Sequence, residues 1–255
     1  MIECKIKVDG FQLFMREMGQ GTPTVIFESA MGGNLGSWCP VQMEVSKKAR
    51  SIAYDRVGNG RSEKSPNPRN ILIMARELKS MLFEARIEPP FLLVAASYGG
   101  FVSRAFASMF TDEVKGMILV DPSHEDFMLG VKNRRTEDEW QAYMSGMDMM
   151  AQRSKGCFKE EWESYFENTD CIREIKFPDN IPVIVISSSR YGYVEKNFMG
   201  LKKEDIDMKC FLHKSWSIDY PNMVQIITEK SGHDIVSEEP ELVNGTILKM
   251  LESIR

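Results

Sequence analysis

The chain has 255 residues, of which 43% are hydrophobic and 27% are charged, and its formal net charge is −5. This length suits one large α/β domain, and the small negative charge excludes a general electrostatic attraction to nucleic acid or to an anionic membrane. No apolar run approaches a membrane span, and residues 1–7 lack the basic-then-apolar layout of a secretion signal. We therefore expect a cytoplasmic protein without nucleic-acid or membrane partners.

The first 121 residues alternate short apolar runs with stretches of helical spacing. Two runs, 4–8 and 11–15, flank Asp9-Gly10, which predicts an antiparallel hairpin. Further strands are predicted at 24–28, at 51–54, from 91 onward and at 114–121, with helices over 38–45, 71–82 and 102–109. Strands that alternate with helices favour a mostly parallel, doubly wound sheet covered on both faces.

Residues 122–180 interrupt this alternation. Their apolar residues follow helical spacing and the segment is too long for a simple crossover, which predicts a helical cap inserted into the fold. We expect Trp140, Met144, Trp162 and Phe166 to line an apolar pocket beneath this mobile lid. The alternative is that they only pack the cap's own small core.

From residue 181 the strand and helix pattern resumes. A strand at 181–188 is followed by a polar stretch around 202–205 that predicts a surface helix, then by a strand at 223–227 and a closing helix over 243–254. The predicted core is therefore 1–121 together with 181–255.

The five cysteines predict neither a metal site nor a disulfide framework. They are odd in number and widely spaced, and no two form a C-x-x-C pair: Cys4, Cys39, Cys157, Cys171 and Cys210. We interpret them as free thiols and expect no metal or cofactor.

One serine has the surroundings that a nucleophile needs. Ser97 follows an apolar strand and precedes a helix, and Ala95 and Gly99 give a small-x-Ser-x-small turn. Such a turn presents the hydroxyl at the carboxyl edge of a parallel sheet, beside the N–H groups that begin the next helix. The alternative is a buried turn whose serine only caps the helix.

A serine hydroxyl needs a base within hydrogen-bond reach. Of the three histidines, His233 lies in a loop between the last strand and the last helix, in the chain order serine, acid, histidine. We expect His124 and His213 to be solvated side chains.

These features together resemble the α/β-hydrolase fold superfamily over essentially the full length. Four stretches carry the resemblance: 95–99 (Ala-Ala-Ser-Tyr-Gly), 55–62 (Asp-Arg-Val-Gly-Asn-Gly-Arg-Ser), 121–125 (Asp-Pro-Ser-His-Glu) and 231–233 (Ser-Gly-His). The resemblance implies that Ser97 is the nucleophile, that His233 is the base, and that the backbone N–H groups of Met31 and Tyr98 form the oxyanion hole. The 55–62 loop is interpreted as structural.

The chain departs from the superfamily's usual pattern in two places. Glu28-Ser29-Ala30-Met31 replaces the frequent His-Gly of the oxyanion turn, and no aspartate follows the 181–188 strand, where the acid is commonest. We predict that Asp121 is the acid, because its own strand places it at the carboxyl edge next to the serine's strand. Glu195 is the alternative acid.

The resemblance implies a serine hydrolase that cleaves a carboxylic ester, a thioester or an amide of a small, largely apolar substrate through an acyl-enzyme. The same residues could instead serve a perhydrolase or a hydrolase of C–C bonds. A third alternative is a ligand-binding protein built on the same fold, since fold alone does not establish function.

Overall fold

The computed structural model describes residues 1–191 and 200–254. Its strands are β1 (Ile2–Val8), β2 (Phe11–Met18), β3 (Thr24–Glu28), β4 (Ser51–Tyr54), β5 (Phe91–Ala96), β6 (Val114–Val120), β7 (Val183–Ser188) and β8 (Met223–Thr228). Its α-helices are α1 (Cys39–Val45), α2 (Ile71–Glu84), α3 (Gly99–Met109), α4 (Phe127–Lys132), α5 (Glu137–Arg153), α6 (Phe158–Glu163), α7 (Tyr165–Arg173), α8 (Lys203–Asp219), α9 (Ile235–Glu238) and α10 (Pro240–Ile254).

The strands of the described residues form one eight-stranded sheet in the order β1-β2-β4-β3-β5-β6-β7-β8. β1 pairs antiparallel with β2, and β2 pairs antiparallel with β4. All other neighbours in the sheet are parallel. The predicted hairpin and the mostly parallel sheet are therefore confirmed.

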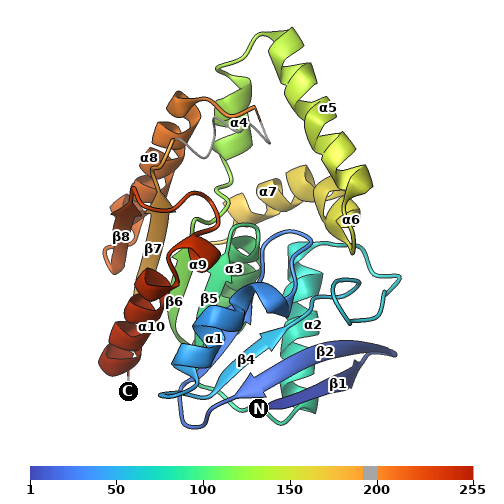
Figure 1. The fold of residues 1–255 in the computed structure, drawn as a ribbon, viewed down its shortest axis with the longest axis vertical. Coiled ribbons are helices and arrows are strands. Elements are labelled where there is room, and N and C mark those ends of the chain that lie inside the picture. The colour runs from blue at the N-terminus through green and yellow to red at the C-terminus, as the bar shows by residue number, and fades with distance from the viewer. Residues whose placement is uncertain (192–199, 255) are drawn as a thin grey trace.

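Helices cover both faces of this sheet, because its central strands are apolar on both sides. In β5, Leu93 and Ala95 belong to one apolar cluster with residues of α2, α3 and α8. The alternate residues Leu92 and Val94 belong to a second cluster with residues of α1, α9 and α10. Figure 1 shows α1 and α10 together, apart from α2. The sheet is thus doubly wound, as the alternation of strands and helices predicted.

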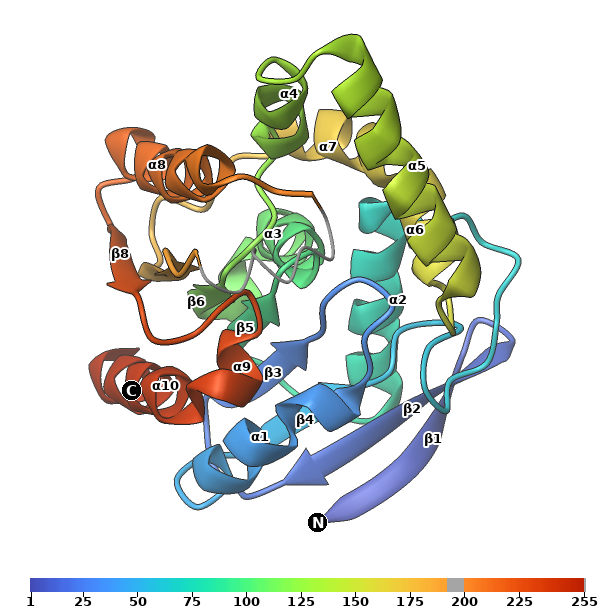
Figure 2. The same ribbon diagram turned by 45° about the horizontal axis from the view of Figure 1, so that its top comes forward.

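The segment between β6 and β7 is helical, as predicted for 122–180, and contains α4, α5, α6 and α7. In Figures 1 and 2 these helices arch away from the sheet, with α5 at their outer side. The N-terminus of α5 is fixed by a capping box, in which Thr136 and Glu139 each accept a hydrogen bond from the other's backbone N–H. That this segment acts as a separate cap stays a prediction.

Four neighbouring parallel strands end at one edge of the sheet. β3, β5, β6 and β7 end at Glu28, Ala96, Val120 and Ser188. Loops that leave this edge carry the candidate residues, which is where ligands bind in open α/β sheets. Within the described residues, none of the helices is both long and apolar enough to cross a membrane. The five cysteines are free thiols, as predicted.

Candidate active site

Ser97 occupies a sharp turn between β5 and α3. Its φ of +51° lies in the left-handed region, which is uncommon for a residue with a Cβ. The turn is held by a hydrogen bond of 3.0 Å from the Ser97 N–H to the carbonyl of Val120. It also needs Gly99, because a Cβ there would lie 2.6 Å from the carbonyl oxygen of Ser29. The glycine two residues after the serine is therefore required by close packing of the backbone.

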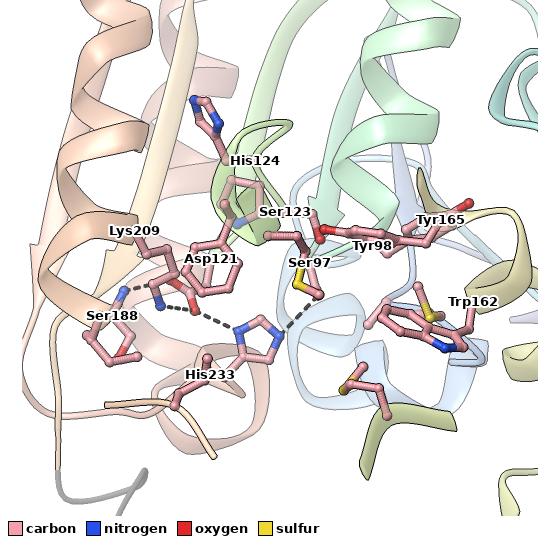
Figure 3. A pocket seen from close by; sticks show the side chains of 18 of the residues that line it. Ser97, Tyr98, Asp121, Ser123, His124, Trp162, Tyr165, Ser188, Lys209 and His233 are labelled. Atoms are coloured by element: carbon pink, nitrogen blue, oxygen red, sulfur yellow. Dashed lines mark hydrogen bonds and ion pairs between the residues drawn. The ribbon is translucent and has the colours of Figure 1, made fainter. Parts of the chain in front are cut away.

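A continuous hydrogen-bond chain joins Ser97, His233 and Asp121 (Figure 3). Oγ of Ser97 lies 3.0 Å from Nε2 of His233. Nδ1 of His233 lies 2.6 Å from Oδ2 of Asp121. Because an ionised carboxylate only accepts hydrogen bonds, Nδ1 carries the proton and Nε2 accepts from the serine hydroxyl. The imidazole is thus oriented to take a proton from Ser97.

Asp121 is held as a buried, ionised carboxylate. Its Oδ1 accepts a hydrogen bond of 2.9 Å from the N–H of Ser188, and its Oδ2 also lies 2.5 Å from Nζ of Lys209. Burial alone would raise the pKa of Asp121, but the positive charge of Lys209 and the hydrogen bond from His233 outweigh it and hold this pKa well below its ordinary value. Glu195, the alternative acid, lies outside the described residues.

The helix predicted at 202–205 exists as α8, but the interpretation of it as a surface helix is wrong. Asp205, Lys209, His213 and Trp216 are all buried along it. Their spacing of four, four and three residues places them on one face of the helix. The role of Lys209 was not predicted, because the neighbouring residues in the sequence are also charged and suggest a solvated helix. The signal that could have revealed it was the spacing of these four residues, which places them on one face.

The expectation that His124 and His213 are solvated is also wrong, since 3% and 0% of these residues are exposed. Nε2 of His213 donates to the Pro122 carbonyl and its Nδ1 accepts from Oγ of Ser187, both at 2.8 Å. Burial lowers the pKa of His213 to about 3 and also lowers the pKa of His124. The ring of His124 stacks on Trp216, with centroids 4.5 Å apart.

Ser97 and His233 border a cavity of about 370 Å³. Most of its apolar lining comes from the helices between β6 and β7: Phe127, Met128, Met147, Met150, Phe158 and Trp162. Met31, Leu201 and Ile206 complete the apolar lining from other parts of the chain. Four methionines in such a wall give it polarisable side chains that adapt to irregular shapes. Four polar residues of the lining, Ser97, Asp121, Ser188 and His233, come from the ends of strands or the loops that follow them at the carboxyl edge of the sheet, so the cavity is apolar with a polar end.

The cavity corrects part of the predicted pocket. Trp162 lines it, whereas Trp140, Met144 and Phe166 do not. Trp140 lies about one turn before Tyr143 in α5 and stacks on its ring, with centroids 5.7 Å apart. Met144 is rotated about 100° around the helix from Tyr143, which does line the cavity. Phe166 is 42% exposed, and its ring contacts those of Trp162 and Tyr165.

Met31 and Tyr98, the predicted oxyanion residues, both line the cavity. Tyr98 directly follows Ser97, and its buried hydroxyl accepts a hydrogen bond of 2.8 Å from Asn168 of α7. Met31 lies in the turn after β3 and precedes Gly32, whose φ is +62°. Their service as oxyanion donors stays a prediction.

The loop 55–62 has the structural role expected of it. The carboxylate of Asp55 accepts hydrogen bonds from the N–H groups of Leu35 at 2.7 Å and Arg61 at 2.8 Å. A Cβ on Gly60 would lie 2.2 Å from the same carboxylate. Asp55 therefore fixes the loop to the segment after β3. Within residues 1–191 and 200–254, no cluster of three or more His, Cys, Asp or Glu residues could hold a metal ion.

Known proteins share this architecture. A model of the family described as "alpha/beta hydrolase fold" matches residues 23–166. Among curated proteins, the uncharacterized protein YqjL of Bacillus subtilis is 32% identical over 108 residues, which are 42% of this chain and 43% of that protein. The putative carbamate hydrolase RutD of Azorhizobium caulinodans is 29% identical over 109 residues, or 43% of this chain and 40% of that protein. The chain thus matches less than half of the length of these relatives.

Solved structures match over nearly the full length of the chain. An AqdC variant described by its recognition and ring-cleavage of the Pseudomonas quinolone signal has a TM-score of 0.73 at 14% identity, covering 99% of this chain and 100% of that one. An esterase from Thermogutta terrifontis has a TM-score of 0.66 at 17% identity, covering 100% and 99%. At such identities the likeness concerns the fold. Since the family model spans more than half of the sequence, the chain belongs to the alpha/beta hydrolase fold family.

Proposed function

We propose that this chain is a serine hydrolase that cleaves a carboxylic ester, a thioester or an amide of a small, largely apolar substrate. The observation that carries the proposal is the hydrogen-bond chain from Ser97 through His233 to Asp121, placed at the reactive end of an apolar cavity. Relatives described as a putative carbamate hydrolase and a carboxylesterase, the latter from Bacillus subtilis, support acyl chemistry.

The first half of the reaction forms an acyl-enzyme. Oγ of Ser97 attacks the substrate carbonyl carbon while its proton passes to Nε2 of His233. The carbonyl oxygen becomes an oxyanion, which the N–H groups of Met31 and Tyr98 stabilise. Asp121 stabilises the imidazolium. Collapse of this intermediate breaks the bond to the leaving group, which takes the proton from His233.

The second half returns the enzyme to its starting state. A water molecule gives a proton to His233 and attacks the acyl carbonyl, and a second oxyanion forms at the same donors. Its collapse releases the carboxylic acid and restores the proton to Ser97. We propose that the helices of 122–180 cover the apolar part of the substrate, since Phe127, Met147 and Trp162 come from them.

The test is turnover of chromogenic esters of graded acyl length, together with labelling by a fluorophosphonate. Ser97→Ala should abolish labelling and lower kcat by several orders of magnitude, as loss of a triad member does. Ser123→Ala is the matched control, because Ser123 lies in the same cavity wall but its hydroxyl is not in the chain to His233, and this variant should still be labelled. Equal labelling of Ser97→Ala and the unaltered protein would refute the proposal.

A further inference from the structure

The turn that carries Met31 is held by two buried charged side chains, one bound before Met31 and one bound after it. Arg56 of the loop after β4 binds the carbonyl of Ala30, and Glu161 of α6 binds the N–H of Gly32. Arg56 is 3% exposed and Glu161 is 0% exposed. Neither side chain exchanges a proton or forms a bond in the proposed reaction.

Arg56 fixes the peptide that precedes Met31. Its Nη2 donates a hydrogen bond of 2.7 Å to the carbonyl of Ala30, and its Nη1 donates one of 2.5 Å to the carbonyl of Ser29. The carbonyl of Ala30 and the N–H of Met31 belong to one planar trans peptide and point in opposite directions. Holding that carbonyl against the guanidinium therefore aims the Met31 N–H away from Arg56. A charge-assisted bond to the carbonyl also polarises the peptide and strengthens its N–H as a donor.

Glu161 fixes the peptide that follows Met31. Its Oε2 accepts a hydrogen bond of 2.7 Å from the N–H of Gly32. Gly32 must be a glycine here, since a Cβ would lie 2.7 Å from Cβ of Phe158, which also belongs to α6. The two peptide planes that flank Met31 are thus each held by one charged side chain.

The two charged side chains are joined to each other. Nε and Nη2 of Arg56 each lie 2.9 Å from an oxygen of Glu161, which is a bidentate pair. Asn59 adds a hydrogen bond of 3.2 Å to Oε1 of Glu161, and Glu28 at the end of β3 pairs with Nη1 of Arg56. A bidentate buried pair restricts both partners to one geometry. The pair of Arg56 and Glu161 therefore fixes the orientation of the turn.

We propose that Arg56 and Glu161 are positioning residues that aim the Met31 N–H at the developing oxyanion, so that α6 of the 122–180 segment completes the active site. This inference rests on the proposed serine hydrolase function. Loss of Glu161 would free the Gly32 peptide and leave Arg56 with one carboxylate partner, Glu28, among the described residues. The donor would then be present but misaligned.

The decisive variant is Glu161→Gln, which keeps the shape of the side chain and removes its charge. We expect kcat per active site for a 4-nitrophenyl ester to fall about 10- to 100-fold, short of the roughly 10²- to 10³-fold that deleting an oxyanion donor costs. KM should change little, because the donor acts on the transition state. An alkyl trifluoromethyl ketone, which forms an oxyanion adduct with Ser97, should lose affinity in proportion to kcat/KM.

Active sites are counted by fluorophosphonate titration, so that unfolded protein does not enter kcat. Arg56→Lys is the second variant, since lysine keeps the charge but cannot reach the same carbonyls and carboxylates together, and it should show the same pattern. Glu77→Gln is the matched control: it breaks another buried arginine pair, with Arg69 at 2.7 Å, whose described hydrogen bonds do not reach the turn. This control should keep kcat per active site.

Each outcome decides between the two proposals. Wild-type kcat per active site in Glu161→Gln, or a raised KM with kcat unchanged, would overturn the positioning role and leave the serine hydrolase intact. Absence of both ester turnover and fluorophosphonate labelling of Ser97 in the unaltered protein would overturn the proposed function and this inference with it. A fall in kcat that the trifluoromethyl ketone affinity does not follow would also overturn the inference.

Discussion

Acid should destabilise this protein through His213, and the effect begins near pH 6.5. This imidazole is fully buried and neutral, because desolvation lowers its pKa to about 3 and the Lys209 ammonium adds to the shift, against the opposing charge of Asp121. His124 also faces it and disfavours its charged form. The Pro122 carbonyl and the Ser187 hydroxyl already occupy both ring nitrogens. Protonation of Nδ1 would require the Ser187 hydroxyl to turn away.

The sign and the size follow from proton linkage. Below pH 6.5 the unfolded chain takes up a proton on this histidine and the folded chain does not, so the free energy of unfolding falls as the pH falls toward 3. With an ordinary pKa of about 6.5 in the unfolded state, His213 alone removes about 2 kcal/mol between pH 7 and pH 5. Above pH 6.5 its contribution is complete and does not change.

Urea unfolding at pH 7, 6 and 5 measures this effect. His213→Gln should lose about 2 kcal/mol less than the unaltered protein between pH 7 and pH 5, because glutamine can donate to the same carbonyl but does not titrate. Ser187→Ala is the control: it removes the hydrogen-bond partner but keeps the imidazole, so it should lower stability at every pH and keep the slope. Equal pH slopes for His213→Gln and the unaltered protein would refute the reasoning.

Three further predictions concern the active site. Lys209→Met should lower the free energy of unfolding at neutral pH, because the buried carboxylate of Asp121 then loses the cation that holds its pKa low. Lys209→Arg should keep most of that stability, and unchanged stability in Lys209→Met would contradict the argument. Trp162→Ala should shift the ester profile toward longer or bulkier acyl groups as the cavity grows; a lower melting temperature with an unchanged profile would assign this residue to packing alone. Gly99→Ala should destabilise the fold by about 1–3 kcal/mol in thermal unfolding and abolish activity. Gly245→Ala is its control: a Cβ there meets open space in α10, so this variant should stabilise the fold by about 0.5–1 kcal/mol. Similar stabilities for the two variants would count against the close packing at the serine turn.

Sequence reasoning worked where short-range pattern decides the structure. Apolar runs of four to seven residues became strands because both faces of a parallel strand are covered, and the run itself carries that information. The loops that hold Ser97, Asp121 and His233 could be placed at one sheet edge for the same reason. Parallel strands that alternate with helices all end on the same side.

What sequence could not supply was long-range contact. Glu161 lies 105 residues from Arg56, and only the packing of α6 against the turn after β3 brings them together. The prediction of the cavity wall was wrong for a related reason. Periodicity predicts a helix at α5, but the packing of that helix decides which of its sides lines the cavity, and this side carries Met147 and Met150 rather than Met144. The charged residues of α8 predicted a surface helix. Lys209 is nevertheless buried, because it pairs with Asp121, which lies 88 residues away in the sequence.

The position of the proposed acid has a physical basis at the end of β7. The commonest site for the acid in this fold follows that strand, but here the strand end provides a donor: the N–H of Ser188 binds Oδ1 of Asp121. Lys209, in the second turn of α8, binds Oδ2 together with His233. Two donors and a positive charge thus converge on one point at the end of β6, and a carboxylate is the side chain that satisfies all of them. An asparagine there would leave the buried Lys209 without the counter-charge of Asp121. Asp121 therefore both stabilises this edge of the sheet and orients the imidazole of His233.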